Sequence, residues 1–227
     1  MGTTLRDANE LNLNIATDLS MPSTKQNALL LDFGNVVFGI DFRKVFDNWA
    51  KQANVDASVF FDKWSMDVAY EAHEIGAINF EQYIDHLSNL FEVELSIDQW
   101  RAGWNDIWTG PYVDVLALLP PLKAHYGLYA FTNTNHTHSH YWRTAWGEQL
   151  SVFEYIFESS RIGLRKPDTA AFTYICDAID TPPERVIFLD DNAQNVQGAQ
   201  TAGLQAVQVA GEAEVLAYLN QLLEQAN

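Results

Sequence analysis

Chemically useful side chains stand at the ends of three short apolar runs that lie far apart in the sequence. Asp32 closes the first run, Thr132 and Asn133 close the second, and Asp190 and Asp191 close a later one. If these runs are parallel strands of one sheet, their carboxyl ends share one edge, the edge at which open α/β folds bind ligands. The sequence therefore predicts that these side chains meet in one cleft.

A cleft with these side chains suits phosphoryl transfer. Its three carboxylates, each with an ordinary pKa of ~4, repel one another at neutral pH unless a hard cation lies between them. Mg²⁺ takes one or two carboxylates together with waters and phosphate oxygens. The Thr132 hydroxyl and the Asn133 N–H can donate to phosphate oxygens, and Lys166 in "RIGLRKPD" adds positive charge. Asp32 could then attack phosphorus in line and form an aspartyl-phosphate that water hydrolyses.

The elements that would position these residues are short buried strands that alternate with helices. Brief apolar runs that stop at polar or turn residues predict strands at 28–33, 127–132, 185–190 and 204–209, with a weaker candidate at 155–159. Helical patterns between the later runs cover 169–179, 193–202 and 212–224. This alternation predicts an α/β fold with a Rossmann-like parallel sheet that is covered on both faces.

Residues 41–112 have a different character, because aromatic and apolar residues recur there at helical spacing and no strand-like run appears. Trp100, Trp104 and Trp108 follow at intervals of four, which predicts one helix face that packs into a core. We therefore expect an all-helical cap inserted into the α/β core. Pro120-Pro121 is expected to interrupt the helix before the second strand.

The expected division of the chain has three parts. They are a polar N-terminal extension at 1–27, an α/β hydrolase core at 28–40 and 113–227, and a helical cap at 41–112. The extension lacks the basic start and apolar stretch of a secretory signal, and no run reaches the length of a membrane span. We expect a cytoplasmic protein.

The charge balance restricts the partners. Thirteen Lys and Arg against thirty Asp and Glu give a formal charge of -17, which repels nucleic acid and anionic membranes. The partner expected is a small phosphorylated metabolite, and the chain is expected to be a monomer or a homodimer. Cys176, the only cysteine, excludes an internal disulfide, and its helical apolar surroundings predict a buried thiol.

Four stretches together resemble the motifs of the haloacid dehalogenase-like superfamily of phosphohydrolases. In order, they are "LLLDFGNVV", "YAFTNTN", "GLRKPD" and "VIFLDDNAQN". The resemblance covers about 28–210, and the helical insertion stands in the place of that superfamily's helical cap. The first motif is also similar to that of bacterial phosphatases of the α-D-glucose-1-phosphate type, which likewise reads Asp-x-Gly-Asn.

The resemblance implies a role for each matching residue. Asp32 would be the nucleophile and a Mg²⁺ ligand, Gly34 would offer its backbone carbonyl to the metal, and Asp191 would be a direct ligand. Asp190 would act on the metal through water, and Asn195 would hold that loop. The phosphate would be bound by Thr132, Asn133 and Lys166.

Gly34 departs from the pattern of most phosphatases in the superfamily. They carry a second aspartate two residues after the nucleophile, which acts as general acid and then as base. Glycine can do neither, and a positioned acid/base is worth about 10²–10⁴ in rate. We hypothesise that His138 substitutes, because it follows the second strand and histidine titrates in the right range. His136, His138 and His140 alternate, a pattern that also occurs in metal sites. Because a helix is expected to begin here, a polar helix start is the preferred interpretation.

The sequence thus predicts a Mg²⁺-dependent phosphatase that acts on a small phosphorylated metabolite, a sugar phosphate for preference. One alternative is a catalytically weakened binding or regulatory protein, motivated by Gly34. Another is a 2-haloacid dehalogenase, which needs no metal and against which the Asp190-Asp191 pair argues. In the cap, Glu71, His73 and Glu74 are candidates to face the substrate, although a solvated helix end is the default interpretation.

Overall fold

The computed structural model describes residues 27–226, so the predicted N-terminal extension, save its last residue, lies outside the described part. Five strands form one sheet in the order β5-β4-β1-β6-β7, and every neighbouring pair is parallel. The strands are β1 (Ala28–Leu31), β4 (Gly127–Thr132), β5 (Tyr155–Glu158), β6 (Val186–Asp190) and β7 (Gln205–Gln208). The predicted α/β fold with a parallel sheet is confirmed.

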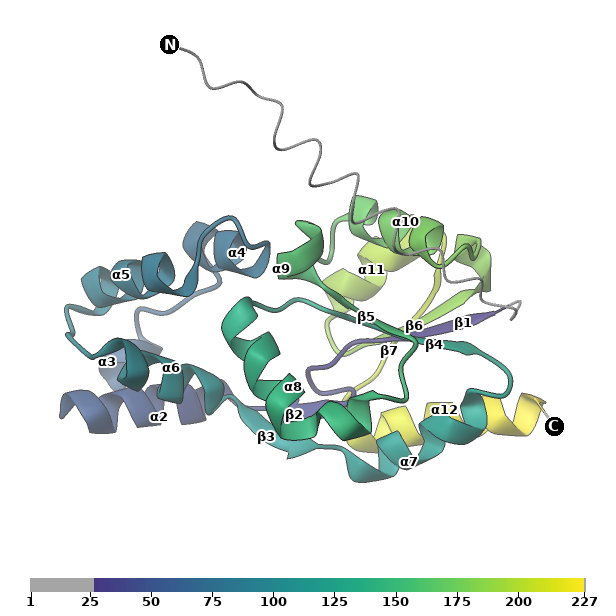
Figure 1. Cartoon of the computed structure of the whole chain (residues 1–227), viewed down its shortest axis with the longest axis horizontal. Coiled ribbons are helices and arrows are strands. Elements are labelled where there is room, and N and C mark those ends of the chain that lie inside the picture. Colours follow the sequence, from purple (N-terminus) through teal and green to yellow (C-terminus); the bar gives the residue numbers. More distant parts are fainter. Residues whose placement is uncertain (1–26, 227) are drawn as a thin grey trace, which may run out of the picture.

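Helices cover both faces of this sheet because the strand side chains alternate between them (Figure 1). Leu29 and Leu31 pack toward α7 (Val113–Leu122), α8 (His136–Leu150) and α12 (Glu212–Ala226). Leu30 packs toward α10 (Thr169–Ala178) and α11 (Ala193–Thr201) on the other face. Both faces of β1 are thus buried, which accounts for its unbroken apolar run.

Short elements complete the core around the sheet. α9 (Ser159–Ile162) follows β5 directly, and a 3₁₀ turn at Pro183–Arg185 leads into β6. α8 begins at the N-cap Asn135, whose side chain accepts from the backbone N–H of His138. The three alternating histidines therefore do lie in the first turns of a helix, as the polar helix start requires.

Helices make up most of the inserted region (Figure 1). They are α2 (Phe42–Ala53), α3 (Ser58–Phe61), α4 (Val68–Glu74), α5 (Phe80–Phe91) and α6 (Ile97–Asn105). They enclose a separate apolar cluster built around aromatic rings, in which Trp49 stacks on Trp104 at a centroid distance of 5.9 Å. Trp100 and Trp104 are both buried there, so the core-packing interpretation holds for these two residues.

The region is not purely helical, which corrects two expectations. β3 (Trp108–Pro111) pairs antiparallel with β2 (Phe38–Ile40), and this small ribbon forms the stem of the cap. α6 ends at Asn105, so Trp108 lies on a strand and not on the helix face of the other two tryptophans. The run "WTGP" is too short and too turn-like to show a strand period, and its pairing with β2 is what makes it a strand.

Pro120 and Pro121 do not interrupt α7, contrary to the expectation. Both lie in its last turn. Their missing N–H groups therefore remove hydrogen bonds only near the end of the helix. The helix then closes through the bond from Lys123 N to Leu119 O. Among the helices of residues 27–226, none is long and apolar enough to cross a membrane.

Candidate active site

Three carboxylates from two neighbouring strands meet at the carboxyl edge of the sheet. Asp32 follows β1, and its backbone N–H donates to Leu189 O of β6 at 2.9 Å, which sets it beside the end of that strand. One oxygen from each of Asp32, Asp190 and Asp191 lies within 4.8 Å of the others. The parallel topology has brought together residues that are more than 150 positions apart.

Lys166 lies between two of these carboxylates. Its Nζ lies 2.6 Å from Asp32 Oδ1 and donates to Asp190 Oδ2 at 2.7 Å and to Phe131 O at 3.0 Å. The side chain is 1% exposed. Burial alone would lower the pKa of Lys166, but the attraction of Asp190 and Asp32 outweighs it and raises the pKa. The amine is therefore a fixed positive charge at neutral pH.

The loop that carries Lys166 is fastened from two sides. The Asn133 side chain donates to Lys166 O and accepts from Lys166 N, both at 2.9 Å. On the other side, a Cβ at Gly198 of α11 would come within 2.1 Å of Pro167 O, so only glycine allows this close approach. The Asn133 side chain thus positions Lys166, a function that the sequence did not indicate.

Asp190 is fully buried and is surrounded by donors. Besides Lys166, its Oδ1 accepts from Asn192 N at 2.8 Å, and the Asn195 amide donates to both of its oxygens at 3.1 Å. A buried carboxylate is stable only when its oxygens are paired in this way. Asn195, which was expected to hold this loop, donates to Asp190 at the start of it.

Asp191 has a partner that sequence reasoning missed. The side chain of Asn35 donates to Asp191 Oδ2 at 2.8 Å, across 156 positions of sequence. Asn35 adopts the left-handed region with φ 55°, which asparagine tolerates better than most residues. The signal in the sequence for this contact is an asparagine in the turn directly after Gly34.

Asp32 has a strongly perturbed acidity. Burial raises its pKa to about 7, with Asp190 and Asp191 acting in the same direction and Lys166 opposing them. Burial also raises the pKa of Asp191, although the Asn35 hydrogen bond opposes it. A cation near these oxygens would favour their charged forms and lower both values.

Thr132 and Asn133 line the same cleft as Asp32, Gly34 and Lys166. Thr132 is 2% exposed, and its hydroxyl donates to Asn133 O at 3.4 Å, a long hydrogen bond that leaves it ready to turn toward a ligand. The structure therefore brings the sequence-predicted residues of all four motifs to one cavity of about 450 Å³.

His138 also borders this cavity, but both nitrogens of its ring lie next to polar groups of the protein. Nε2 lies 3.0 Å from Trp104 O of the cap, and Nδ1 lies 3.4 Å from the Asn135 amide. Burial lowers the pKa of His138 to about 3, despite the opposing bond to Trp104. A neutral ring with a partner at each nitrogen is poorly suited to supply a proton at neutral pH, which speaks against His138 as the substitute for the missing acid.

The cap forms the opposite wall of the cleft. Arg165, next to Lys166, reaches across to α4, where it donates to Glu74 Oε2 at 2.9 Å and to Glu71 Oε1 at 2.8 Å. Glu74 is buried, so the default interpretation of a solvated helix end is wrong for it, as it is for the buried His73. The rest of the wall is largely apolar: Ile40, Phe42, Met66, Tyr70, Ile107 and Trp108.

The donor set fits a hard divalent cation. The three carboxylates supply the oxygen ligands that Mg²⁺ prefers, and the hydrogen bonds described leave Asp32 Oδ2 and Asp191 Oδ1 outside them. Both oxygens of Asp190 accept hydrogen bonds from Lys166, Asn192 and Asn195, which suits an indirect role. Asp32 and Asp191 are accordingly the carboxylates best placed to hold the ion.

Two curated proteins illustrate what the chain is similar to. A D-ribitol-5-phosphate phosphatase of Bacteroides thetaiotaomicron is 22% identical over 190 residues, which cover 79% of this chain and 90% of that protein. Drimenol cyclase drtB of Aspergillus calidoustus is 43% identical over 60 residues, which cover 26% of this chain. The match spans only 11% of the cyclase.

A solved structure shares the fold over most of both chains. It is an enzyme of the HAD family from Bacteroides thetaiotaomicron in complex with magnesium and inorganic phosphate, with a TM-score of 0.71 and 24% identity. The superposition covers 82% of this chain and 96% of that one. At the level of sequence, residues 27–203 match the family described as haloacid dehalogenase-like hydrolases. The chain belongs to this family.

Proposed function

We propose that the protein is a Mg²⁺-dependent phosphatase that hydrolyses a small phosphorylated metabolite through an aspartyl-phosphate on Asp32. The observation that carries the proposal is the cluster of Asp32, Asp190 and Asp191 with Lys166 ion-paired inside it at the sheet edge. This arrangement pairs a nucleophile with a fixed positive charge, as phosphoryl transfer requires.

In the first step an oxygen of Asp32 bonds to phosphorus and the bond from phosphorus to the leaving oxygen breaks. Lys166 would stabilise charge on the phosphoryl oxygens, with the Thr132 hydroxyl and the Asn133 backbone N–H as further donors. The departing oxygen takes a proton from water. A water molecule then attacks the aspartyl-phosphate, which releases inorganic phosphate and restores the Asp32 carboxylate.

Asp32 and Asp191, with the backbone carbonyl of Gly34, would hold Mg²⁺, and Asp190 would contact it through water. When bound, the ion would neutralise the carboxylates and polarise the phosphoryl oxygens. Asn35 would keep Asp191 turned toward the ion, since partners of metal ligands fix their orientation.

A sugar phosphate is the substrate class that we favour. The cleft offers the Glu74 carboxylate for hydroxyls and apolar side chains for a ring face, and a D-ribitol-5-phosphate phosphatase is among the relatives. The Asp-x-Gly-Asn motif adds the similarity to phosphatases of the α-D-glucose-1-phosphate type. Sugar 1-phosphates have comparatively good leaving groups, which reduces the need for the acid that Gly34 lacks.

We also propose that residues 41–112 act as a cap that covers the cleft and excludes water during turnover. The Arg165 contacts with Glu71 and Glu74 are the ion pairs that join this wall to the core.

A second candidate function is a catalytically weakened binding or regulatory protein. Gly34 favours it, because a glycine stands where most phosphatases of the superfamily carry the aspartate that acts as acid and base. Such a protein would bind phosphate esters without turnover. A 2-haloacid dehalogenase, the third possibility considered, would act in the absence of metal.

Phosphate release from a panel of sugar phosphates, measured with Mg²⁺ and with EDTA, separates these functions. The proposal expects release that requires Mg²⁺ and that the Asp32→Asn variant loses. Saturable binding of sugar phosphates without release favours the binding protein, and chloride release from a 2-chloroacid in EDTA favours the dehalogenase. Either result would overturn the phosphatase proposal.

A further inference from the structure

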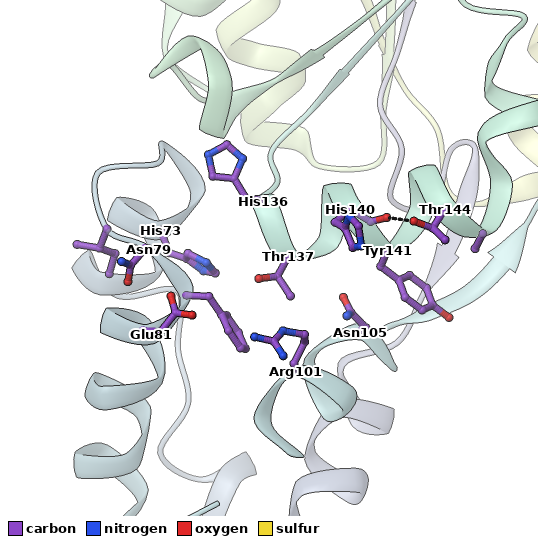
Figure 2. A pocket seen from close by; sticks show the side chains of 13 residues that line it. His73, Asn79, Glu81, Arg101, Asn105, His136, Thr137, His140, Tyr141 and Thr144 are labelled. Carbon is purple, nitrogen blue, oxygen red and sulfur yellow. Dashed lines mark hydrogen bonds between the residues drawn. The ribbon is translucent and has the colours of Figure 1, made fainter. Parts of the chain in front are cut away.

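A second cavity, of about 540 Å³, lies between the cap and the core. Its walls come from α4, α5 and α6 of the cap and from α8 of the core (Figure 2). It shares no lining residue with the active-site cleft described above. Its volume falls in the range of pockets that bind small molecules, which is roughly 300–1,000 Å³.

Two polar atoms buried at this cavity lack a hydrogen-bond partner in the described part of the chain. They are His73 Nδ1 and Asn105 Oδ1, and His73 is 3% exposed. Leaving a buried polar atom unpaired costs about 1–3 kcal/mol, so such atoms are rare in folded proteins. Both side chains line the cavity, so these two atoms are the unsatisfied groups that a ligand bound there could pair.

The cavity also gathers basic groups in a strongly acidic protein. It is lined by three of the six histidines, His73, His136 and His140, and by Arg101, whereas the chain as a whole carries a charge of -17. Glu81 is the one carboxylate in the lining. Figure 2 shows the Arg101 side chain between those of Glu81 and Asn105, below Thr137.

Arg101 and Asn105 are one helical turn apart on α6, so they can contact adjacent groups of one ligand. Arg101 Nη1 lies 2.7 Å from Asp98 Oδ1, and the guanidinium carbon lies 5.6 Å from the centre of the Phe80 ring. Arginine presents several N–H donors, so one exposed ion pair does not exhaust them. Apolar contact is offered by Ile78, Phe80 and Tyr141.

We propose that this cavity is a binding site for a small carboxylate that carries an apolar body and a hydroxyl beside the carboxylate. Arg101 and the Nδ1–H tautomer of His73 would donate to the carboxylate, and Asn105 Oδ1 would accept from the hydroxyl. The apolar body would lie against Phe80 and Tyr141. Burial lowers the pKa of His73 to about 4, so its ring is neutral at pH 7 and can adopt that tautomer.

The site would respond to the position of the cap. His73 adjoins Glu74 on α4, and His136 lies two residues from His138 on α8, so both walls of the cavity continue into the active-site cleft. A ligand that contacts α4, α6 and α8 at once binds best when the cap lies against the core as it does here.

Isothermal titration with phenyllactate, phenylpropionate and phenylpropionamide tests the site, because these probes differ only in the hydroxyl and the charge. Phenyllactate should bind tightest, about two- to tenfold more tightly than phenylpropionate, since one neutral hydrogen bond separates them. Phenylpropionamide should bind at least about tenfold more weakly than phenylpropionate, because it has no charge for Arg101.

Three variants locate the binding. Arg101→Gln should weaken both acids by about tenfold or more, and Arg43→Gln, at an exposed position of α2 outside the cavity, should leave them unchanged. Asn105→Leu should remove the preference for phenyllactate and leave phenylpropionate unaffected. Melting curves without ligand check that each variant is folded.

Several results would overturn the proposal. They are failure of the acids to bind more tightly than the amide, unchanged affinity in folded Arg101→Gln, and a phenyllactate preference that survives Asn105→Leu. Acid binding that inorganic phosphate and Mg²⁺ compete away would place the probe in the active-site cleft and would equally contradict the assignment.

Discussion

The two walls of the active-site cleft hold their charges in different ways. At the sheet edge, Lys166 is 1% exposed and contacts Asp32, Asp190 and a backbone carbonyl at once. Across the cleft, Arg165 of the core is 20% exposed and pairs with two cap residues, Glu71, which is 51% exposed, and Glu74, which is 6% exposed. The charges at the sheet edge are buried and each has several contacts, whereas the charges on the cap side extend outward to Glu71, which is open to water.

This difference assigns chemistry and selectivity to different walls. Charges that stabilise a transition state act best when they are fixed and shielded from water before the substrate arrives. Exposed ion pairs contribute little energy and rearrange easily, which suits a wall that must move and accept a substrate. Substitutions at the sheet edge should therefore affect turnover and stability, and substitutions on the cap wall should affect mainly KM.

The largest effect is expected from Lys166→Met, which keeps the packing against Phe131 and Phe188 but removes the charge. It leaves Asp32 and Asp190 close together without their cation, so kcat should fall on the order of 10³-fold or more. In EDTA the free energy of unfolding should fall by about 3–5 kcal/mol, the usual cost of breaking a buried ion pair. Steady-state kinetics and urea unfolding measure the two effects.

Lys44→Met is the matched control, because Lys44 is exposed on α2 and does not line the cleft. It should change neither kcat nor stability appreciably. If Lys166→Met and Lys44→Met behaved alike, the contrast between the two walls would be invalid.

The next largest effect is expected from restoring an acid at Gly34. A Cβ there would lie 3.0 Å from Ile40 Cδ1, so Gly34→Asp is best combined with Ile40→Val to make room. With an alkyl phosphate, whose leaving group needs a proton, kcat should rise by about 10²-fold. With p-nitrophenyl phosphate, whose leaving group needs none, it should stay nearly constant.

Ile40→Val alone should leave kcat unchanged for both substrates and serves as the control. An equal rise for both substrates would mean that the new carboxylate does not act as an acid. A fall for both would mean that the cleft does not tolerate the side chain.

Much of the sheet edge was predictable because topology alone decides it. Parallel strands place their carboxyl ends together, so the positions of Asp32, Thr132 and Asp190 followed from three apolar runs. Partners that depend on loop geometry could not be found in this way. The contact between Asn35 and Asp191 spans 156 positions and requires a left-handed residue in the turn.

The cap was less predictable because helical spacing shows which side of a helix is buried but not what it is buried against. The spacing that grouped Trp108 with Trp100 and Trp104 continues past the true helix end at Asn105. The same limitation applies to the role predicted for His138. Its position after β4 was correctly inferred, but its partner, the Trp104 carbonyl, belongs to the cap.

The junction between cap and core should be sensitive to acid, and His138 is the reason. Its pKa is about 3 in the folded protein and about 6.5 when unfolded, so the unfolded chain binds the proton first as pH falls. The contribution of His138 is thus complete above pH 6.5 and declines below it, by about 2 kcal/mol at pH 5. Urea unfolding of the wild type and of His138→Gln at both pH values measures this term.

The variant should lose less stability than the wild type between pH 7 and pH 5, although it is less stable at pH 7. His125→Gln, at an exposed position, should follow the wild-type dependence. Equal slopes for the wild type and His138→Gln would mean that the ring is accessible to protons and that cap and core are not joined through it.

The smallest effect is expected from Glu71→Gln on the cap wall. Removing this negative charge from the rim of the cleft should lower KM for an anionic substrate by about two- to threefold, the usual size of an exposed pair, and leave kcat unchanged. The change should disappear at high salt, because exposed charges are screened. Kinetics at two ionic strengths measures it, with Glu81→Gln, outside the cleft, as the control. A large loss of kcat in Glu71→Gln would show instead that the cap wall takes part in the chemical step, since an exposed carboxylate that only shapes binding cannot change the barrier once substrate is bound.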